Sequence, residues 1–201
     1  MQYDPELQNH NLPHNPFKAL ISPRPIAWIS STSTTNILNL APYSFFNAFC
    51  DTPPIIGFGA TKGKDSQRNI EETKEFVCNI ASYDMRHKIS DTSAPVASDV
   101  SEFELANLDH VPSQKVSVPR VKGIPAAFEC VYLKTITLES YDNKATEYDL
   151  ILGQVVSIYI DDQYITDTGL VDVTKYRPLS RLGYKDYASV DSVFEITRPI
   201  K

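Results

Sequence analysis

Apolar and polar residues alternate along several segments of this chain, as they do in β-strands, and this pattern most constrains its fold. The segments do not alternate regularly with helical ones. In residues 150–160 five of the six even positions are apolar, whereas the odd positions include Gly153 and Ser157. A period of two is typical of a β-strand. Residues 134–139 alternate in the same way, which predicts that Ile136 and Leu138 point inward. Residues 128–133 are apolar on both faces, so we expect this second strand to start fully buried.

Four earlier segments are also rich in strand-forming residues, namely 25–31, 37–49, 55–61 and 76–81. A short helix is expected between the last two, capped by Asp65 or Ser66. Two short helices are expected within residues 82–108, where Ser101 and Glu104 have capping-box spacing. Six or more strands with few helices favour an antiparallel sheet closed into a barrel over a doubly wound fold. The sequence also has no G-x-G-x-x-G motif.

The composition is that of an ordinary globular protein, and it limits the classes of partner. The 201 residues are 42% hydrophobic and carry a formal charge of -6, from 19 Lys and Arg against 25 Asp and Glu, with no basic run. Nucleic-acid binding and a polybasic membrane contact are therefore not expected. No apolar stretch approaches the roughly 20 residues of a membrane-spanning helix. Acids and prolines stand where a secretory signal would begin, so we expect a cytoplasmic protein.

The chain is expected to form one domain, residues 17–201, preceded by a polar, proline-broken arm, residues 1–16. Its cysteines, Cys50, Cys78 and Cys130, lack C-x-x-C spacing and are expected to be buried or half-buried free thiols. The four histidines lack metal-ligand spacing, and the chain has neither a G-x-S-x-G nor a G-x-x-x-x-G-K-[ST] motif. We therefore predict no metal site and name no catalytic residue.

The segment NLAPYSFFN, residues 39–47, is the first candidate for ligand binding. Pro42 has no backbone N–H, so the strand that contains it belongs at an edge or opening of the sheet. Tyr43 and Phe45 add flat aromatic surface, and Ser44 adds a hydrogen-bonding group. This combination suits a planar heteroaromatic ligand. From the residues alone, packing of the same rings in the barrel core is an equally good interpretation.

Residues 62–69 are the second candidate. A helix that begins near Asp65 or Ser66 presents free backbone N–H groups and the positive end of its dipole, with Lys64 and Arg68 close by. These groups suit a phosphate. The alternative, and the commoner meaning of such a stretch, is a surface helix with solvated lysines.

These segments occur in an order that closely resembles one known family. The motifs that carry the resemblance are RPIAWISS at 24–31, NLAPYSFFN at 39–47, PP at 53–54, KDS at 64–66, NI at 69–70, EFV at 75–77, EFE at 102–104, VP at 118–119, EC at 129–130, LGQVV at 152–156 and PLSRLG at 178–183. Over about residues 17–190 the chain resembles the flavin reductase-like, flavoredoxin-type family of FMN-binding split barrels. The resemblance implies a mainly β, antiparallel Greek-key split barrel with a few short helices, which binds FMN more tightly than FAD and forms a homodimer.

The resemblance also implies which residues contact the cofactor. Those expected along the isoalloxazine ring and ribityl chain are Asn39, Leu40, Ala41, Pro42, Tyr43, Ser44 and Phe45. Those expected at the ribityl-phosphate end are Ser30, Ser31, Lys64, Ser66 and Asn69. Arg181 and Tyr187 lie in the closing motif, near the cofactor or a dimer contact. Trp28 either packs in the core or lies near the flavin.

Two departures from the family pattern bear on this site. Residues 34–38 stand where the family usually has an acid-glycine turn, and Asn36 could take the left-handed turn conformation there, although glycine adopts it more readily. Tyr184 stands where a second glycine is common after Gly183, and this tyrosine could partly cover the pocket. Cys50 follows the flavin motif and is expected to be a bystander thiol.

The sequence leaves three functions open. The main hypothesis is a flavin reductase that takes hydride from NADH or NADPH onto bound flavin and passes electrons to free flavin, a partner monooxygenase, ferric iron or a small organic compound. The second is a flavin-binding electron carrier or storage protein that does not oxidise nicotinamide. The third is a dimeric scaffold that has lost flavin. Turnover with NADH or NADPH separates the first two, and a yellow colour excludes the third.

Overall fold

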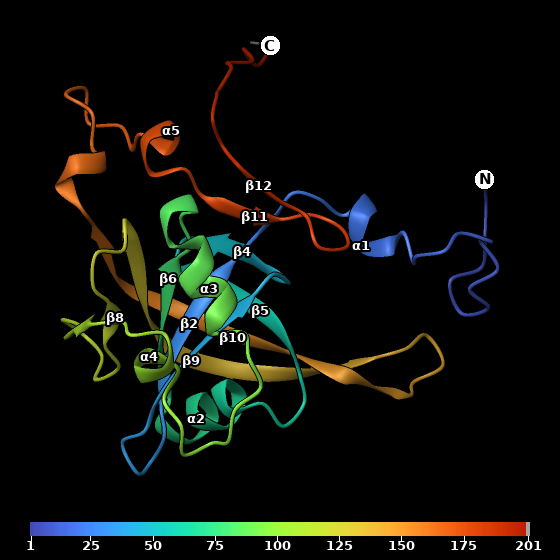
Figure 1. The fold of residues 1–201 in the computed structure, drawn as a ribbon, viewed down its shortest axis with the longest axis horizontal. Helices are drawn as coiled ribbons and strands as arrows, with labels where there is room; N and C mark the ends of the chain where they lie inside the picture. Colours follow the sequence, from blue (N-terminus) through green and yellow to red (C-terminus); the bar gives the residue numbers. More distant parts are fainter. Residues whose placement is uncertain (200–201) are drawn as a thin grey trace.

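A computed structural model describes residues 1–199, and its main feature is an antiparallel sheet of seven strands (Figure 1). The order across the sheet is β3-β2-β6-β9-β10-β5-β4. The strands are β2 (Ala27–Thr32), β3 (Leu38–Tyr43), β4 (Phe46–Asp51), β5 (Pro54–Thr61), β6 (Glu75–Ile80), β9 (Ala126–Glu139) and β10 (Ala145–Ile160). The predicted mainly β, antiparallel architecture with a few short helices is confirmed.

The segment predicted as one strand over residues 37–49 forms two strands, so that prediction is wrong. β3 pairs with β2, whereas β4 pairs with β5. At the bend between β3 and β4 the Phe45 carbonyl accepts a hydrogen bond of 2.7 Å from the Gly59 N–H. A Cβ atom on Gly59 would lie 3.3 Å from the Cβ of Phe45, so glycine permits this close approach. The bend carries the chain from one edge of the sheet to the other, and the two edges meet there.

β9 and β10 are the strands that the alternation predicts, but the predicted inward orientation of Ile136 and Leu138 is wrong. Ile136 and Leu138 are 37% and 40% exposed, and the buried positions of β10 are Asp149, Ile151, Gly153 and Val155. The inner face holds Gly153 because the Phe76 ring packs directly on it, and an added Cβ would lie 2.4 Å from that ring. β9 starts only partly buried. The packing of Phe76 thus leaves no room for a side chain at position 153, whereas the apolar residues Val156 and Ile158 of the same strand are exposed.

α2 (Asp65–Thr73) is the predicted short helix, but the predicted caps are wrong. Its N-cap residue is Lys64, whose side chain forms no capping bond. The carboxylate of Asp65 pairs with Arg68 instead, and the hydroxyl of Ser66 donates to a buried asparagine on β3. Both side chains are therefore engaged away from the cap position.

Residues 82–108 contain the two short helices expected, α3 (Arg86–Asp91) and α4 (Glu102–Leu105), after the 3-10 turn η1 (Tyr83–Met85). The predicted capping box is wrong. Ser101 is the N-cap of α4, but its hydroxyl forms no capping bond and has no hydrogen-bond partner among the described residues. α4 is a single turn, and its Glu104 side chain is exposed.

The remaining elements are short, namely α1 (Phe17–Leu20), β1 (Arg24–Pro25), β7 (His110–Val111), β8 (Arg120–Val121), η2 (Asp162–Tyr164), α5 (Val173–Tyr176), β11 (Leu179–Arg181) and β12 (Tyr187–Ser189). β1, β11 and β12 form a separate sheet beside the barrel (Figure 1). Residues 1–16 contain neither helix nor strand, and their separation as an arm from a domain over 17–201 stays a prediction. No helix of the described chain is long and apolar enough to cross a bilayer.

Two apolar clusters form the core, and successive residues of β2 alternate between them. Trp28 belongs to one cluster and Ile29 to the other. The Trp28 side chain is fully buried, and its indole N–H donates a hydrogen bond of 2.8 Å to the Thr92 hydroxyl. Trp28 is therefore a packing residue, the first of its two predicted roles.

All three cysteines are free, as predicted. Cys78 and Cys130 are fully buried in the core. Burial raises the pKa of both thiols well above the ordinary value, so they stay protonated and unreactive. Cys50 is half-buried on β4.

Candidate functional site

β3 is an edge strand, as Pro42 predicts. Pro42 lies opposite Trp28 of β2, and among the described residues no strand pairs with the other edge of β3. Residues 39–40 are buried, residues 41–44 are half-buried, and Phe45 is 36% exposed. The inner half of the motif, residues 39–40, is therefore buried, whereas the outer half, residues 41–45, is partly open to solvent.

A buried polar network surrounds the inner half of β3. The Oδ1 atom of Asn39 accepts hydrogen bonds from the hydroxyls of Ser31 (3.1 Å) and Ser66 (2.7 Å). Its Nδ2 atom donates to both carboxylate oxygens of Glu102 at 2.9 Å, and Glu102 Oε2 also accepts from the Leu40 N–H at 2.9 Å. Burial raises the pKa of the Glu102 carboxyl, and these hydrogen bonds partly offset that rise. The network satisfies the polar groups of this half internally.

Two further residues predicted at the phosphate end join internal contacts. Asn69 Nδ2 donates to the Ser31 hydroxyl at 3.3 Å, and Asn79 Nδ2 donates to the Ser30 hydroxyl at 2.7 Å. The Oδ1 atom of Asn69 is buried and has no partner among the described residues. The predicted contact residues that face the interior, and line neither hollow described below, are Ser30, Ser31, Leu40, Ser66 and Asn69. Their contact with a cofactor stays a prediction.

A hollow of about 220 Å³ lies between β3 and the start of α2, and we call it the α2 hollow. Its walls are residues 39 and 41–43 of β3, the N-cap Lys64 and first residue Asp65 of α2, the segment 92–96 and Glu102. Two of the nearby cations are already paired, Lys62 with Asp149 at 3.8 Å and Arg68 with Asp65. Lys64 lines the hollow and forms no ion pair with the described residues. Its ammonium and the N–H groups that begin α2 are the groups available to an anion.

A second hollow, of about 330 Å³, shares Pro42 and Tyr43 with the first, and we call it the β11 hollow. Its aromatic walls include Phe45, Tyr148 and Tyr184, and its cations are Lys18, Arg24 and Arg181. None of the described residues that line it is acidic. The hollow therefore combines flat apolar surface with positive charge.

Tyr43 forms part of the wall of both hollows. Its ring packs against Phe58 with 4.7 Å between centroids. Burial raises the pKa of Tyr43 to about 12, so its phenol is neutral at physiological pH. Tyr43 thus offers aromatic surface and a neutral hydroxyl rather than charge.

Both residues that depart from the family pattern adopt the left-handed backbone conformation. Asn36 has φ of 64°, as predicted for the turn before β3, and Tyr184 has φ of 56°. A tyrosine is strained in this region, whereas glycine is not. Tyr184 is 52% exposed and lines the β11 hollow, with the His14 ring 5.7 Å from its own. Whether it covers a flavin stays a prediction.

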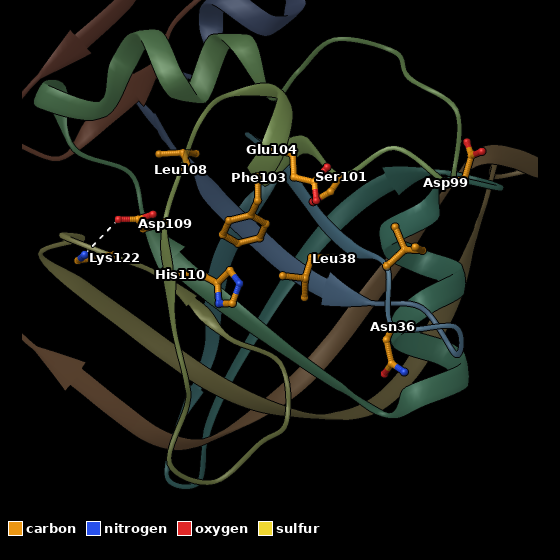
Figure 2. Close-up of a pocket in the computed structure, with 11 residues that line it drawn as sticks. Asn36, Leu38, Asp99, Ser101, Phe103, Glu104, Leu108, Asp109, His110 and Lys122 are labelled. Carbon is orange, nitrogen blue, oxygen red and sulfur yellow. Dashed lines mark hydrogen bonds and ion pairs between the residues drawn. The ribbon is translucent and has the colours of Figure 1, made fainter.

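A third hollow, of about 630 Å³, lies between the Asn36 turn, α4 and β7 (Figure 2). None of the predicted site residues lines it. Its charged residues are Asp99, Glu104, Asp109 and Lys122, and the last two form an ion pair of 3.1 Å. The hollow is larger than the other two but carries mostly negative charge, which disfavours a phosphate.

The predicted residues that line the two hollows at β3 are Asn39, Ala41, Pro42, Tyr43, Ser44, Phe45, Lys64 and Arg181. Lys18, Arg24 and Glu102 also line these hollows, and the sequence analysis did not predict them as site residues. Arg24 stands three residues before the buried strand β2, and a charge beside the apolar residues 26–29 is a signal that could have been used. No sequence signal separates buried Glu102 from exposed Glu104 two positions later.

Comparison with known proteins connects this site to a family. Residues 20–180 match the family described as flavin reductase like domain. The chain belongs to that family. An uncharacterized member from Aquifex aeolicus is 36% identical over 173 residues, which cover 84% of this chain and 85% of the relative.

Solved structures support the same assignment. Nitrilotriacetate monooxygenase component B from Bacillus cereus superposes with a TM-score of 0.88 at 31% identity, and the match covers 98% of both chains. A Shewanella frigidimarina protein with a split barrel domain has a TM-score of 0.85 at 19% identity over 99% of this chain and 100% of that one, a likeness of fold alone. The predicted split barrel is confirmed, and the family is one of flavin-related proteins.

Proposed function

We propose that this family member binds FMN along the outer half of β3, takes hydride from NADH or NADPH onto it and passes the electrons to an acceptor. The observation that carries the proposal is the pair of hollows that share Pro42 and Tyr43 on an open strand edge. One hollow adjoins a helix start with a free lysine, and the other is aromatic and cationic. FMN has an anionic end and a planar end, so it matches this arrangement.

The phosphate end is assigned to the α2 hollow. Lys64 and the first N–H groups of α2 can donate to phosphate oxygens. Two acids also line this hollow. The charge of Asp65 is offset by the ion pair with Arg68, and the carboxyl of Glu102 is engaged by the Asn39 amide and the Leu40 N–H. A terminal phosphate fits this seat better than the internal diphosphate of FAD, so we expect FAD to bind more weakly.

The ring end is assigned to residues 42–45. Pro42 has no N–H to offer, and the half-buried strand edge leaves room for a flat ring against Tyr43 and Ser44. When bound, the flavin supplies the hydride-accepting and electron-transferring chemistry. The chain binds and orients it, so the proposal assigns no general acid or base.

The acceptor is proposed from relatives. The Bacillus cereus structure with 31% identity is named as a component of a monooxygenase, which favours an oxygenase as the partner that receives electrons. Free flavin and ferric iron are the other acceptors in the proposal.

We further propose that the active species is a homodimer. Exposed apolar side chains follow β9 and β10, and they are Val131, Leu133, Ile136, Leu138, Val156 and Ile158, each at least 37% exposed. An apolar surface of this kind on a sheet is typical of a protein interface. Sedimentation of the flavin-loaded protein is expected to give a dimer, and Leu133→Asp is expected to shift it toward monomer, with Tyr141→Asp at the exposed 140–144 turn as the control. A flavin-loaded wild-type monomer contradicts this proposal.

The test of the proposed reaction is a visible spectrum of the FMN-loaded protein under anaerobic conditions, before and after addition of NADH or NADPH. Bleaching of the flavin absorbance within the time of a steady-state assay is the expected result. A protein that holds FMN but stays oxidised for hours with either nicotinamide is an electron carrier or storage protein, the second hypothesis.

A further inference from the structure

A fourth hollow, of about 610 Å³, lies between α3 and the β11–β12 pair, and we call it the α3 hollow (Figure 1). Small-molecule sites have volumes of roughly 300–1,000 Å³. Backbone hydrogen bonds join its walls. The Tyr83 N–H donates to the Arg177 carbonyl at 2.9 Å, and the Leu179 N–H donates to the Ala81 carbonyl, also at 2.9 Å. The α3 hollow is therefore preformed, and the proposed flavin site does not use it.

The α3 hollow carries more positive than negative charge. Its basic lining residues are Arg86, His87 and Arg177, and Asp191 is the one acid among the described lining residues. Asp191 pairs with Arg177, with 3.0 Å between Oδ1 and Nε. Arg86 forms no ion pair with the described residues. One guanidinium of this hollow therefore lacks a counter-charge.

The Tyr83 ring positions both guanidiniums. The Cζ atom of Arg86 lies 4.1 Å from the ring centre, and that of Arg177 lies 4.0 Å from it. Arg86 is half-buried and donates once to the protein, from Nη1 to the Tyr83 carbonyl at 3.0 Å. Its Nε and Nη2 atoms donate to none of the described residues. A guanidinium that is held in place and keeps free donors suits the oxygens of a phosphate.

The α3 hollow and the β11 hollow lie along one face of the sheet β1-β11-β12. Residues opposite each other in an antiparallel pair, and residues two apart on a strand, point to the same face. Arg181 lies opposite Tyr187, and two residues earlier Leu179 lies opposite Ser189. Arg181 lines the β11 hollow, whereas the other three line the α3 hollow. Two residues of a strand span roughly 7 Å, so the two hollows are neighbours.

Arg181 and Tyr187 form the boundary between these neighbouring hollows. The Arg181 Cζ lies 4.3 Å from the centre of the Tyr187 ring, and Tyr187 is 47% exposed. The pair thus presents an aromatic and cationic surface that is partly open to solvent. A ligand long enough to reach from the β11 hollow into the α3 hollow passes over this surface.

We propose that the α3 hollow binds the adenosine diphosphate half of the nicotinamide donor. Arg86 and the Ser90 hydroxyl, one helical turn apart on α3 and both in the wall, bind the phosphates. The inference rests on the proposed function, in which the nicotinamide half of the donor meets the flavin ring. In that proposal the flavin ring fills the β11 hollow of about 330 Å³, so the rest of the donor lies outside it.

The first experiment is isothermal titration of the FMN-loaded protein with ADP and with adenosine, so that the flavin already occupies the seat at Lys64. ADP is expected to bind at least about tenfold more tightly, the ratio that one charge-assisted hydrogen bond gives. Arg86→Gln is expected to remove that preference and to leave adenosine binding unchanged. Arg120→Gln is the matched control, because Arg120 also stacks on a tyrosine, with its Cζ 3.6 Å from the Tyr159 ring centre, and lines none of the four hollows.

The second experiment compares steady-state kinetics with the active dinucleotide, NADH or NADPH, and with reduced nicotinamide mononucleotide, which lacks the adenosine phosphate half. Arg86→Gln is expected to raise KM for the dinucleotide at least about tenfold with kcat unchanged, because a contact away from the reacting atoms is equally strong in the ground and transition states. KM for the mononucleotide is expected to stay the same. General damage to the fold changes both constants.

Three results overturn the inference. They are equal binding of ADP and adenosine to the wild type, unchanged ADP affinity in folded Arg86→Gln, and an equal rise in KM for dinucleotide and mononucleotide in that variant. Any of these results, in a protein whose flavin is reduced by the dinucleotide, rejects the α3 site and leaves the proposed function standing. ADP binding that depends on Arg86, in a protein whose flavin stays oxidised, supports the nucleotide site and rejects the proposed reaction.

Discussion

The two halves of β3 differ in how their polar groups are used. At residues 39–40 the side chains of Ser31, Ser66 and Glu102 satisfy the polar groups of the strand internally. At residues 41–45 the strand edge is open, and the same motif lines two hollows. The inner half of β3 therefore stabilises the fold, and the outer half binds the ligand in our proposal.

The largest expected effect tests the inner half. Glu102→Ala removes the acceptor for the Asn39 amide and the Leu40 N–H, and two buried donors without partners are expected to lower the free energy of unfolding by about 3 kcal/mol. Urea denaturation measures the change. Glu104→Ala on the exposed face of the same short helix is the control, with an expected change below about 0.5 kcal/mol. If Glu102→Ala and Glu104→Ala are equally stable, the hydrogen bonds of Glu102 do not stabilise the inner half of β3, and the proposed difference between the two halves is wrong.

The next effect tests the outer half at the α2 hollow. Lys64→Ala is expected to weaken FMN binding by about 10- to 150-fold, because one charge-assisted hydrogen bond is lost, with riboflavin binding almost unchanged. Fluorescence titration with both flavins measures this. Lys62→Ala is the control, since Lys62 pairs with Asp149 outside the hollow. If FMN and riboflavin lose affinity equally, Lys64 does not contact the phosphate.

A smaller effect tests the β11 hollow at its rim. If Tyr184 has to move before a nicotinamide reaches the flavin, Tyr184→Gly is expected to raise the single-turnover rate of flavin reduction about fivefold, equivalent to about 1 kcal/mol. Stopped-flow absorbance gives the rate. Tyr184→Phe keeps the ring and is expected to react like the wild type. An unchanged rate in the glycine variant places Tyr184 away from the path of the donor.

The smallest effect is the pH dependence of the inner network. Burial raises the pKa of Glu102 in the folded protein, so its contribution to stability is fully present below the ordinary value of 4.5 and is lost as the pH rises through the raised pKa. The unfolding free energy of the wild type is therefore expected to rise relative to that of Glu102→Gln as the pH falls toward 4.5. A constant difference across this range contradicts the raised pKa.

Local patterns predicted the strands, the α2 helix and the edge position of Pro42, because period and backbone chemistry depend on neighbouring residues. The faces of β10 were not predictable in this way. Gly153 is buried because the Phe76 ring, far away in the sequence, packs on it. Burial of Arg24 and Glu102 likewise depends on partners from distant segments, Leu182 for the first and Asn39 for the second. These contacts follow from the closed barrel, and among them only the charge of Arg24 beside an apolar segment leaves a local signal.

Binding of FMN at β3 is tested by titration of the flavin-free protein with FMN, followed by the change in flavin absorbance and fluorescence. We expect saturable binding of one FMN per chain with a dissociation constant in the micromolar range or below. Glu104→Ala, which alters only the hollow of Figure 2, is expected to leave that constant unchanged. No FMN binding in the micromolar range contradicts the proposed flavin site, as does a loss of binding in Glu104→Ala equal to that in Lys64→Ala.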